Sequence, residues 1–478
     1  MLDATTLGDF GSLRRIHRPF SSVSTKPGAL RGRQPVGSGS PDLPVIPRSE
    51  RRLVSVDSSV DTDIVPLFPP NTTITRDGTL AVGGCRLDEL AREFGTPTFV
   101  VDESGLRSQA RAFAQGLDGR RPGSQVAFAS KSFPARAIYR VMADEGLLID
   151  VAGGGELVMA LDADVAPESI VLHGNAKTDS ELTMALDAGV GTIVIDSLPE
   201  IERIESLAAA STRVMLRVQP GVDPRTQAAI STGHRGSKFG VRLEQVAEAV
   251  TAISRSRHLE LEGIHLHLGS QMLDLNPWVE AIKVISGLGT FDVYDVGGGL
   301  GVRYTRAETA PTVDDYLDTL VQAAADYLPD SARLIIEPGR ALVARSTTTI
   351  YRVVTVKPGD PTFVAVDGGM ADNFEASTYF GQPFDATVVT RLGGQTLVNV
   401  VGRQCESGDQ LAPQVLLDEP AVGDVIALPM TGAYTHTLAN NYNGALRPAI
   451  VFVRDGQAHP VVRRDTYADL LARELPWP

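Results

Sequence analysis

The sequence has few cysteines and no long uncharged apolar run, and both absences exclude classes of protein. Two cysteines, Cys85 and Cys405, in 478 residues exclude a disulfide framework and a cysteine-based zinc finger. No uncharged apolar run reaches the roughly 18 residues that a membrane-spanning helix needs. A net charge of −14 argues against a nucleic-acid footprint over the body of the chain. We therefore expect a cytoplasmic protein that binds neither nucleic acid nor membrane.

The first 60 residues differ in composition from the rest of the chain. They hold nine Lys or Arg against five Asp or Glu, and they are rich in Ser, Pro and Gly without a sustained apolar period. Such a segment has too little apolar surface to bury on folding. We therefore expect a disordered tail over residues 1–70.

Further along, short aliphatic runs alternate with stretches of helical spacing, the clearest being Leu198–Ala209, Leu243–Ser254 and Val313–Leu328. Continuous apolar strands, each followed by a helix, indicate a parallel sheet that is buried on both faces. Eight such units predict a (β/α)8 barrel over residues 101–343. The expected strands are Gln125–Ser130, Leu147–Val151, Ser169–Gly174, Thr192–Asp196, Arg213–Val218, Ile264–Leu268, Val293–Gly297 and Leu334–Pro338.

After the barrel the pattern changes to strands without helices of comparable length. This change predicts an antiparallel β-domain over residues 344–478, as a barrel or a sandwich. We expect residues 71–100 to join this domain with its first strands and an entry helix. The strand-like runs are Thr349–Lys357, Phe363–Asp367, Ala386–Arg391, Leu397–Gly402, Val425–Pro429 and Ala449–Arg454.

The carboxyl ends of the expected barrel strands carry many ionisable groups, and in such a barrel the chemistry lies at those ends. Each group alone has an ordinary explanation, such as a rim lysine, a tight glycine turn or a core histidine. Together they form a set that random strand ends rarely supply. In chain order the ends carry Lys131, Asp150, His173, Asp196, Arg217, His267, Gly297–Gly299 and Glu337.

Four of these features match the needs of one cofactor. Partial desolvation lowers the pKa of a lysine such as Lys131 and frees its amine for imine chemistry. The glycines Gly297–Gly299 let backbone amides approach a phosphate. His267 lies inside a strand, two residues after His265, and can stack on an aromatic ring; a zinc pair is disfavoured because no third ligand is evident nearby. Glu337 can pair with a pyridinium nitrogen. The set predicts pyridoxal 5′-phosphate.

Two motifs of the β-domain complete the candidates. Cys405-Glu406-Ser407-Gly408-Asp409 places a thiol beside carboxylates, and Gly432-Ala433-Tyr434 follows a strand end. A buried inert cysteine is the usual interpretation, whereas a thiol beside acids can also deliver a proton.

These motifs resemble the diaminopimelate decarboxylases, pyridoxal phosphate enzymes of the alanine-racemase-like fold that also includes ornithine and arginine decarboxylases. The resemblance runs in order from about residue 75 to residue 455. The matching segments are Phe128–Lys131, Asp150–Leu157, His173–Lys177, Ser237–Gly240, His267–Gln271, Asp295–Gly301, Glu337–Arg340, Val366–Met370, Cys405–Asp409 and Tyr442-Asn443.

The resemblance implies a role for each matching residue. Lys131 matches the Schiff-base lysine, His267 the histidine stacked on the ring, and Glu337 the partner of the pyridine nitrogen. Cys405 matches the proton donor and Glu406 a contact to the distal end of the substrate. Members are head-to-tail homodimers, so Cys405 and Glu406 are expected to serve the barrel of the partner subunit. Further implied cofactor or substrate contacts are Ser270, Gly297, Gly298, Gly299, Gly339, Arg340, Tyr379 and Tyr434.

The chain departs from the resemblance at the substrate end. These decarboxylases usually carry an arginine four positions before the tyrosine that matches Tyr379, whereas this chain has Glu375. The arginine grips the distal carboxylate of the substrate. At about 4 Å and an effective dielectric of about 20, each charge pair is worth roughly 4 kcal/mol, so charge reversal weakens binding. A smaller departure is Thr226-Gln227 in place of Thr-His.

The resemblance implies an α-decarboxylase that converts the amino acid meso-diaminopimelate to L-lysine and CO2. Glu375 motivates an alternative, a decarboxylase of the same family for an amino acid with a neutral or cationic distal group. A racemase is a second alternative, although it needs another acid/base opposite the lysine. An inactive binding homologue is a third, and retention of Lys131, Glu337 and Cys405 argues against it.

Overall fold

The computed structural model describes residues 62–224, 226 and 236–477. The expected tail therefore lies outside the described residues up to position 61, and so does Gln227. Residues 62–70 include a short 3-10 helix, Val65–Leu67, with Ile64 and Phe68 buried on either side. Among the described residues, no helix has both the length and the apolar character needed to cross a bilayer.

Eight parallel strands form the predicted closed barrel. Each strand pairs with the next in chain order, and the last pairs with the first. A two-residue strand, β10 (Val241–Arg242), extends the sheet beside the fifth strand. The barrel strands are β5 (Gln125–Ala129), β6 (Leu148–Val151), β7 (Ile170–Leu172), β8 (Thr192–Ile195), β9 (Thr212–Gln219), β11 (Leu259–His265), β12 (Val293–Asp295) and β13 (Arg333–Ile336).

The sixth barrel strand differs most from its prediction, whereas the bounds of the others differ by a few residues at most. The sequence places the sixth strand at Ile264–Leu268, whereas β11 begins at Leu259 and ends at His265. Its first half carries Glu260 and Glu262, which hide it from a search for continuous apolar runs. His267 therefore lies just beyond the strand, in the loop that lines the barrel mouth.

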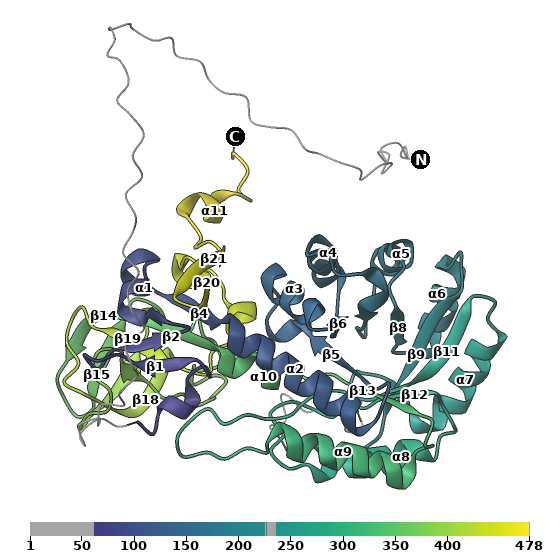
Figure 1. Cartoon of the computed structure of the whole chain (residues 1–478). Coiled ribbons are helices and arrows are strands. Elements are labelled where there is room, and N and C mark those ends of the chain that lie inside the picture. The colour runs from purple at the N-terminus through teal and green to yellow at the C-terminus, as the bar shows by residue number, and fades with distance from the viewer. Residues whose placement is uncertain (1–61, 225, 227–235, 478) are drawn as a thin grey trace, which may run out of the picture. The chain divides into compact units, whose positions relative to one another are not determined.

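Helices surround the barrel on its outer face (Figure 1). Inside the barrel, small and branched side chains from the strands pack into a separate cluster that includes Ala127, Val171, Val194, Met215 and Val293. This layer fills the barrel below its mouth, as expected for this fold. The helices are α2 (Glu103–Arg120), α3 (Arg136–Asp144), α4 (Gly154–Asp162), α5 (Asp179–Ala188), α6 (Leu198–Leu207), α7 (Val246–Arg255), α8 (Asn276–Ser286), α9 (Val313–Tyr327) and the short α10 (Arg340–Val343).

A second sheet forms the β-domain, and most of its strand pairs are antiparallel as predicted. Two pairs, β15–β17 and β4–β20, are parallel. Its order is β18 (Gln410–Leu417), β17 (Thr396–Val401), β15 (Thr362–Val366), β14 (Thr347–Lys357), β4 (Thr98–Asp102), β20 (Ala449–Arg454) and β21 (Gln457–Val462), with β19 (Val425–Leu428) on β14 and β16 (Thr387–Val388) on β19.

The sequence missed β18 and β21, which are the two outermost strands of this order. β18 contains Pro413 and β21 contains Pro460, and proline is tolerated on edge strands because a missing N–H there breaks no ladder. The proline within each of these runs therefore hides the strand from a search for continuous strand-forming residues.

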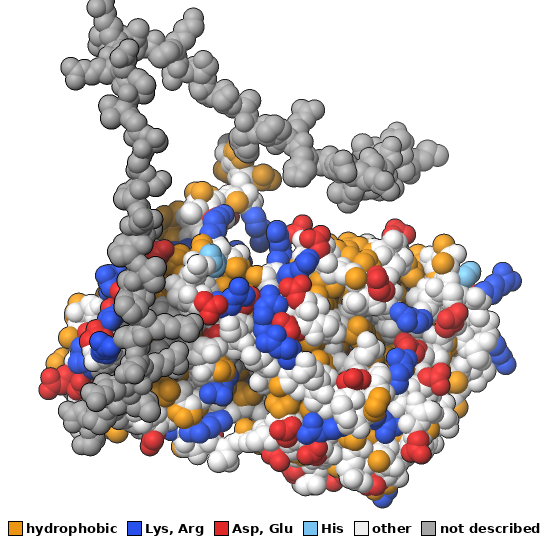
Figure 2. All heavy atoms as spheres, viewed as in Figure 1, with side chains coloured by type: hydrophobic (Ala, Val, Ile, Leu, Met, Phe, Trp, Pro, Cys, Tyr) orange, Lys and Arg blue, Asp and Glu red, His pale blue; other side chains and the backbone are white. Residues whose placement is uncertain are grey.

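Residues before the barrel pack against the β-domain. A three-stranded sheet comprises β1 (Thr72–Ile74), β2 (Leu80–Val82) and β3 (Cys85–Arg86), and α1 (Leu87–Glu93) contacts β14 and β19. A short helix, α11 (Tyr467–Leu471), follows β21 near the C-terminus. On the face drawn in Figure 2, acidic, basic and apolar side chains intermingle rather than gathering by charge.

Candidate active site

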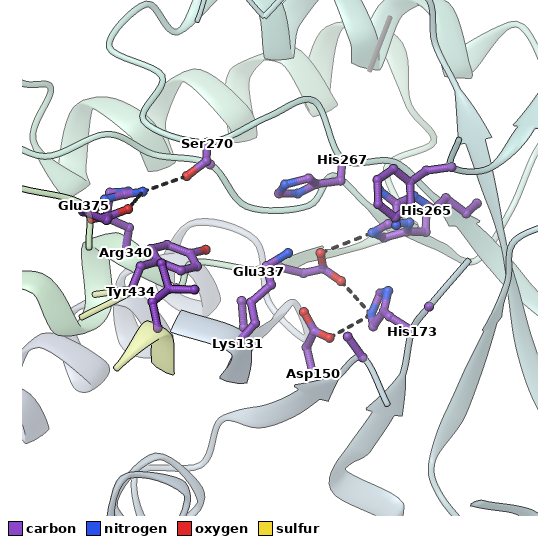
Figure 3. A pocket seen from close by; sticks show the side chains of 18 of the residues that line it. Lys131, Asp150, His173, His265, His267, Ser270, Glu337, Arg340, Glu375 and Tyr434 are labelled. Atoms are coloured by element: carbon purple, nitrogen blue, oxygen red, sulfur yellow. Dashed lines mark hydrogen bonds and ion pairs between the residues drawn. The ribbon is translucent and has the colours of Figure 1, made fainter. Parts of the chain in front are cut away.

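A cavity of about 310 Å³ opens at the carboxyl ends of the barrel strands. Figure 3 shows side chains from several strands and from the β-domain pointing into it. Of the residues expected at the site, the cavity is lined by Lys131, His267, Ser270, Gly299, Glu337, Gly339, Arg340, Glu375 and Tyr434. The lining also includes Asp150, His173, Arg217, Phe239, His265 and Phe380.

Lys131 lies in a 3-10 turn, Ser130–Ser132, directly after β5. The next residue in this turn, Ser132, accepts a 2.8 Å hydrogen bond from the backbone N–H of Tyr434, which brings the β-domain against the lysine. Burial lowers the pKa of Lys131, but the nearby Tyr434, Asp150 and Glu337 outweigh it and raise that pKa above its ordinary value. The expected lowering is therefore wrong, because acidic neighbours surround the amine.

Glu337 follows β13 and lies between two histidines. Its Oε2 accepts a hydrogen bond from His265 Nε2 at 3.2 Å. Its Oε1 is 2.9 Å from His173 Nε2 as an ion pair, but among the described residues this oxygen has no aligned hydrogen-bond donor. Burial raises the pKa of Glu337, yet the two histidines hold it well below its ordinary value. Glu337 is thus a buried carboxylate with acceptor capacity to spare.

Two further carboxyls lie near Glu337. Burial raises the pKa of Asp150 to about 6, against the pull of His173 at 3.7 Å. Burial and the charge of Glu337 raise the pKa of Asp295 well above its ordinary value, although its Oδ1 accepts the Gly297 N–H at 2.9 Å. Of these three carboxyls, Glu337 therefore loses its proton most readily.

Sequence reasoning missed this cluster as a unit. Ligand atoms of His173, His265, Asp295 and Glu337 all lie within 4.8 Å of one another, so His265 clusters with His173 and two carboxylates rather than with His267. His173 was visible as a strand-end residue, and its position on the third barrel strand was the signal that could have assigned it. Asp295 ends β12, two residues before the glycines, and offered the same signal.

The triple glycine is required by close backbone packing. Gly297 and Gly299 have positive φ values of 69° and 113°. A Cβ at Gly298 would lie 1.9 Å from the carbonyl oxygen of Glu337. The Gly298 N–H also donates to His267 Nδ1 at 3.2 Å, which fixes the orientation of that ring. Gly299 lines the cavity directly, whereas Gly297 and Gly298 are not among its lining residues.

Glu375 is paired with Arg340 rather than presented to the cavity as a free charge. The two Arg340 Nη atoms donate to the two Glu375 oxygens at 3.0 Å each, and both side chains are almost fully buried. Tyr304 accepts a hydrogen bond from Arg340 and donates to Glu375 at 3.5 Å. Arg340 Nη2 is 3.5 Å from Ser270 Oγ. We expected Glu375 to face the distal end of the substrate as a single negative charge. Because Glu375 is paired with Arg340, the charges of both residues act on that end of the substrate.

Cys405, Glu406 and Tyr379 are not among the residues that line this cavity. Cys405 is exposed, and its backbone N–H donates to Asn443 at 2.8 Å. Glu406 accepts hydrogen bonds from Tyr379 at 2.8 Å and Tyr442 at 2.5 Å, and these bonds lower its pKa. A surface cluster on the β-domain therefore consists of Tyr379, Cys405, Glu406, Tyr442 and Asn443.

The cavity fits pyridoxal 5′-phosphate. Glu337 Oε1 is a buried carboxylate oxygen with room for a pyridinium N–H beside its ion pair with His173, and Lys131 supplies an amine in the same cavity. The Gly299 backbone approaches without a side chain, and Arg340 Nε is a buried donor without a partner among the described residues. The donors required for a phosphate and the acceptor required for a ring nitrogen therefore line one space.

Comparisons with known proteins agree with this site. Residues 103–344 match the model of the pyridoxal-dependent decarboxylase family, pyridoxal binding domain. A diaminopimelate decarboxylase of Actinosynnema pretiosum subsp. auranticum is 44% identical over 422 residues, covering 86% of this chain and 95% of that relative. The diaminopimelate decarboxylase of Bacillus subtilis is 38% identical over 427 residues, covering 84% of this chain and 96% of the relative.

A solved structure shows the same likeness. Diaminopimelate decarboxylase from M. jannaschii, in a complex with L-lysine, has a TM-score of 0.79 and 30% sequence identity, covering 86% of this chain and 99% of that one. The barrel, the β-domain and the cavity chemistry are those of one enzyme class. The chain belongs to the pyridoxal-dependent decarboxylase family and is a carboxy-lyase that uses pyridoxal 5′-phosphate.

Proposed function

We propose that this enzyme removes the α-carboxylate of meso-diaminopimelate, giving L-lysine and CO2. The observation that carries the proposal is that Lys131 and the ionised, incompletely satisfied Glu337 share one cavity at the barrel mouth. The relatives that match along nearly their whole length bear the name of this activity, and one solved neighbour holds L-lysine.

Different residues would hold the aldehyde end and the ring-nitrogen end of the cofactor. When bound, pyridoxal 5′-phosphate supplies an aldehyde for amine exchange and a ring that withdraws electrons from the α-carbon. Lys131 would hold this group through its side-chain amine. Glu337 would pair with the ring nitrogen and keep it protonated, and His267 would contact the ring. Gly299, Gly339, Arg340, Ser270 and Tyr434 line the cavity and would contact the phosphate or the substrate, whereas Gly297 and Gly298 pack against His267 and Glu337.

The proton that replaces CO2 requires a donor at the α-carbon. We assign this donor to Cys405 of a second copy of the chain, with Glu406 and Tyr379 at the substrate's distal end. Their exposure on the β-domain, outside the cavity of their own chain, supports a shared site in a homodimer. In this division the barrel, residues 101–343, binds the cofactor and residues 344–478 complete the partner's site. Two free cysteines, one of them exposed, support a reducing, cytoplasmic location.

The pairing of Glu375 with Arg340 supports the alternative that the enzyme acts on a different amino acid. Because Arg340 is already neutralised by Glu375, the mouth of the cavity offers less positive charge to a distal carboxylate than a free arginine would. This pairing favours an amino acid whose distal group is neutral or cationic. It also removes the repulsion that an unpaired Glu375 would exert on meso-diaminopimelate, so the two substrates must be compared directly.

The deciding experiment measures CO2 release from meso-diaminopimelate, lysine, ornithine and arginine by the holoenzyme. Turnover of meso-diaminopimelate with kcat/KM at least about tenfold above the other three supports the proposal, a preference worth about 1.4 kcal/mol. Preference for a basic amino acid supports the alternative. Inverted amino acid without CO2 would identify a racemase, and absence of both products an inactive homologue.

A further inference from the structure

His173 lies at the end of β7 between two acids, and the proposed mechanism gives it no role. Its Nε2 is 2.9 Å from Glu337 Oε1 and 3.7 Å from Asp150 Oδ1. The residue is 5% exposed, and its ring meets that of His265 edge to face at a centroid distance of 4.9 Å. Figure 3 shows His173 directed toward both carboxylates.

The two histidines that touch Glu337 differ in character. Burial lowers the pKa of His265 to about 4, so its ring is neutral and donates through Nε2. Burial also lowers the pKa of His173, but Asp150 and Glu337 more than compensate and raise it above its ordinary value. His173 Nε2 lies 2.9 Å from Glu337 Oε1 and 3.7 Å from Asp150 Oδ1, so both carboxylates favour a proton on its ring. His173 is therefore the charged member of the pair.

The electrostatic surroundings include cations as well as acids. Arg217 opposes a proton on His173, but it is engaged over the Phe239 ring at 4.4 Å and faces Asp196 at 3.9 Å. The ionisable side chains that face His173 or line the same cavity are Lys131, Asp150, Arg217, His265, His267, Asp295, Glu337, Arg340, Glu375 and Tyr434.

We propose that His173 is a positioning residue for Glu337: as an imidazolium bridging Asp150 and Glu337, it keeps Glu337 ionised and Oε1 available to the ring nitrogen of bound pyridoxal 5′-phosphate. An ionised carboxylate has about four acceptor positions, so contacts with two histidines leave room for a third donor. A positive charge beside Glu337 favours the carboxylate–pyridinium pair over the neutral pair in which the proton has moved to Glu337. His173 thus acts through Glu337 on the electron-withdrawing strength of the ring.

The first test examines unmodified holoenzyme. The chain has eight histidines, so ¹⁵N labelling of histidine alone gives few ring signals. At pH 7.5, about one unit above the ordinary histidine pKa, we expect one buried histidine with both ring nitrogens protonated. The signal is assigned by its loss in His173→Gln, or in His173→Asn if that variant folds better. A neutral His173 ring at this pH overturns the proposal without any reference to activity.

The second test observes the cofactor through ¹⁵N-labelled pyridoxal phosphate. In His173→Gln, which keeps a polar side chain but removes the charge, we expect the ratio of protonated to unprotonated ring nitrogen to fall by about tenfold, equivalent to one pKa unit. His258→Gln is the matched control, because His258 is partly exposed and pairs with Glu205 at 3.4 Å, outside the cavity lining. An unchanged ring-nitrogen signal in bound His173→Gln rejects the role.

The inference rests on the cofactor and not on the identity of the substrate. Both measurements are made without substrate, so failure to decarboxylate meso-diaminopimelate would leave it intact. A metal ion is the competing occupant of this cluster. Stoichiometric zinc in the purified holoenzyme, lost in both His173→Gln and His265→Gln, would show that the histidines hold a metal and would overturn the proposal.

Discussion

Two buried glutamates line the same cavity and are satisfied in opposite ways. Glu337 has one hydrogen bond from neutral His265 and one ion pair with His173, and its Oε1 keeps an open position. Both oxygens of Glu375 are engaged by the planar guanidinium of Arg340, with Tyr304 alongside. An arginine fork fits a carboxylate in a bidentate manner, whereas two imidazoles approach it singly.

This difference indicates which of the two buried glutamates can still bind a ligand. A saturated carboxylate fixes the position of its partner and has little left to offer, so Glu375 acts as the counter-ion of Arg340. An unsaturated buried carboxylate carries a desolvation cost that a ligand N–H can relieve. We therefore assign Glu337 to cofactor binding and Glu375 to the structure of the cavity wall. The substitutions of these two residues test the two assignments separately.

Replacing Glu337 by glutamine should have the largest effect on activity. The amide of Glu337→Gln would keep the shape of the side chain but lose the charge that stabilises a protonated ring nitrogen. We therefore expect kcat to fall by about 10³-fold, the upper range for one lost stabilising contact. Steady-state CO2 release measures this loss, and a visible-absorbance titration shows whether the cofactor still binds. Retention of more than about a tenth of wild-type kcat would contradict the role given to Glu337.

Replacing Glu375 should lower the free energy of unfolding more than it changes the rate of decarboxylation. Glu375→Gln removes one partner of a buried ion pair and leaves Arg340 uncompensated, a change that typically costs about 3–5 kcal/mol. Glu375→Arg places two guanidinium groups together, so we expect at least as large a loss of the free energy of unfolding. Denaturant unfolding of the cofactor-bound protein measures both variants.

This outcome separates two interpretations of Glu375. The sequence departure alone suggests that Glu375→Arg restores a grip on the distal carboxylate of meso-diaminopimelate. The pairing with Arg340 predicts instead a less stable enzyme with no gain in affinity. A folded Glu375→Arg enzyme with a lower KM for meso-diaminopimelate would favour direct substrate contact and count against the counter-ion role.

Much of this site follows from the sequence, because strand ends in a barrel converge at one mouth. Lys131, His267 and Glu337 are each fixed by a local position at a strand end, and all three line the cavity. Relationships between loops do not follow from local pattern. Glu375 lies 35 positions from Arg340, and nothing in the sequence near either residue reveals that they pair.

The same limit explains the misassigned details of the fold. The edge strands β18 and β21 each tolerate a proline, which elsewhere indicates a loop, because one side of each lacks a neighbouring strand. The direction of the Lys131 pKa shift depends on Asp150, Glu337 and Tyr434, whose proximity to the amine only the folded chain shows. Position along an element is readable from sequence, whereas the balance of charges among elements is not.

Glu406 extends the comparison to an exposed glutamate held by two tyrosines. If its neighbour Cys405 donates the final proton in a partner's site, Cys405→Ser should lower kcat by about 10²-fold, the lower range for a lost general acid. Mixing inactive Cys405→Ser and Lys131→Ala subunits tests sharing, because each hybrid dimer then contains one intact site. Random reassociation should restore about a quarter of the wild-type activity. Activity that stays at the level of the separate variants would place the donor in the same chain as its lysine.

Asp372 is a third buried acid, and its substitution should have the smallest effect. It accepts a hydrogen bond from the Gly369 N–H at 2.9 Å. Within the described part of the chain it has no ion pair like that of Glu375. Burial raises its pKa from 3.8 to about 7. Between these values the folded chain keeps a proton that the unfolded chain has released, so Asp372 makes stability fall as pH rises from about 4 to about 7. Asp372→Asn removes this titration and keeps the acceptor.

We therefore expect Asp372→Asn to gain stability relative to the parent as pH rises, by about 2 kcal/mol between pH 5 and pH 8. Unfolding in urea at both pH values measures the difference, with exposed Asp187→Asn as the control that should show no such trend. A difference that is constant with pH would mean that Asp372 is ionised when folded. In that case burial without a cation would not suffice to neutralise an acid in this protein.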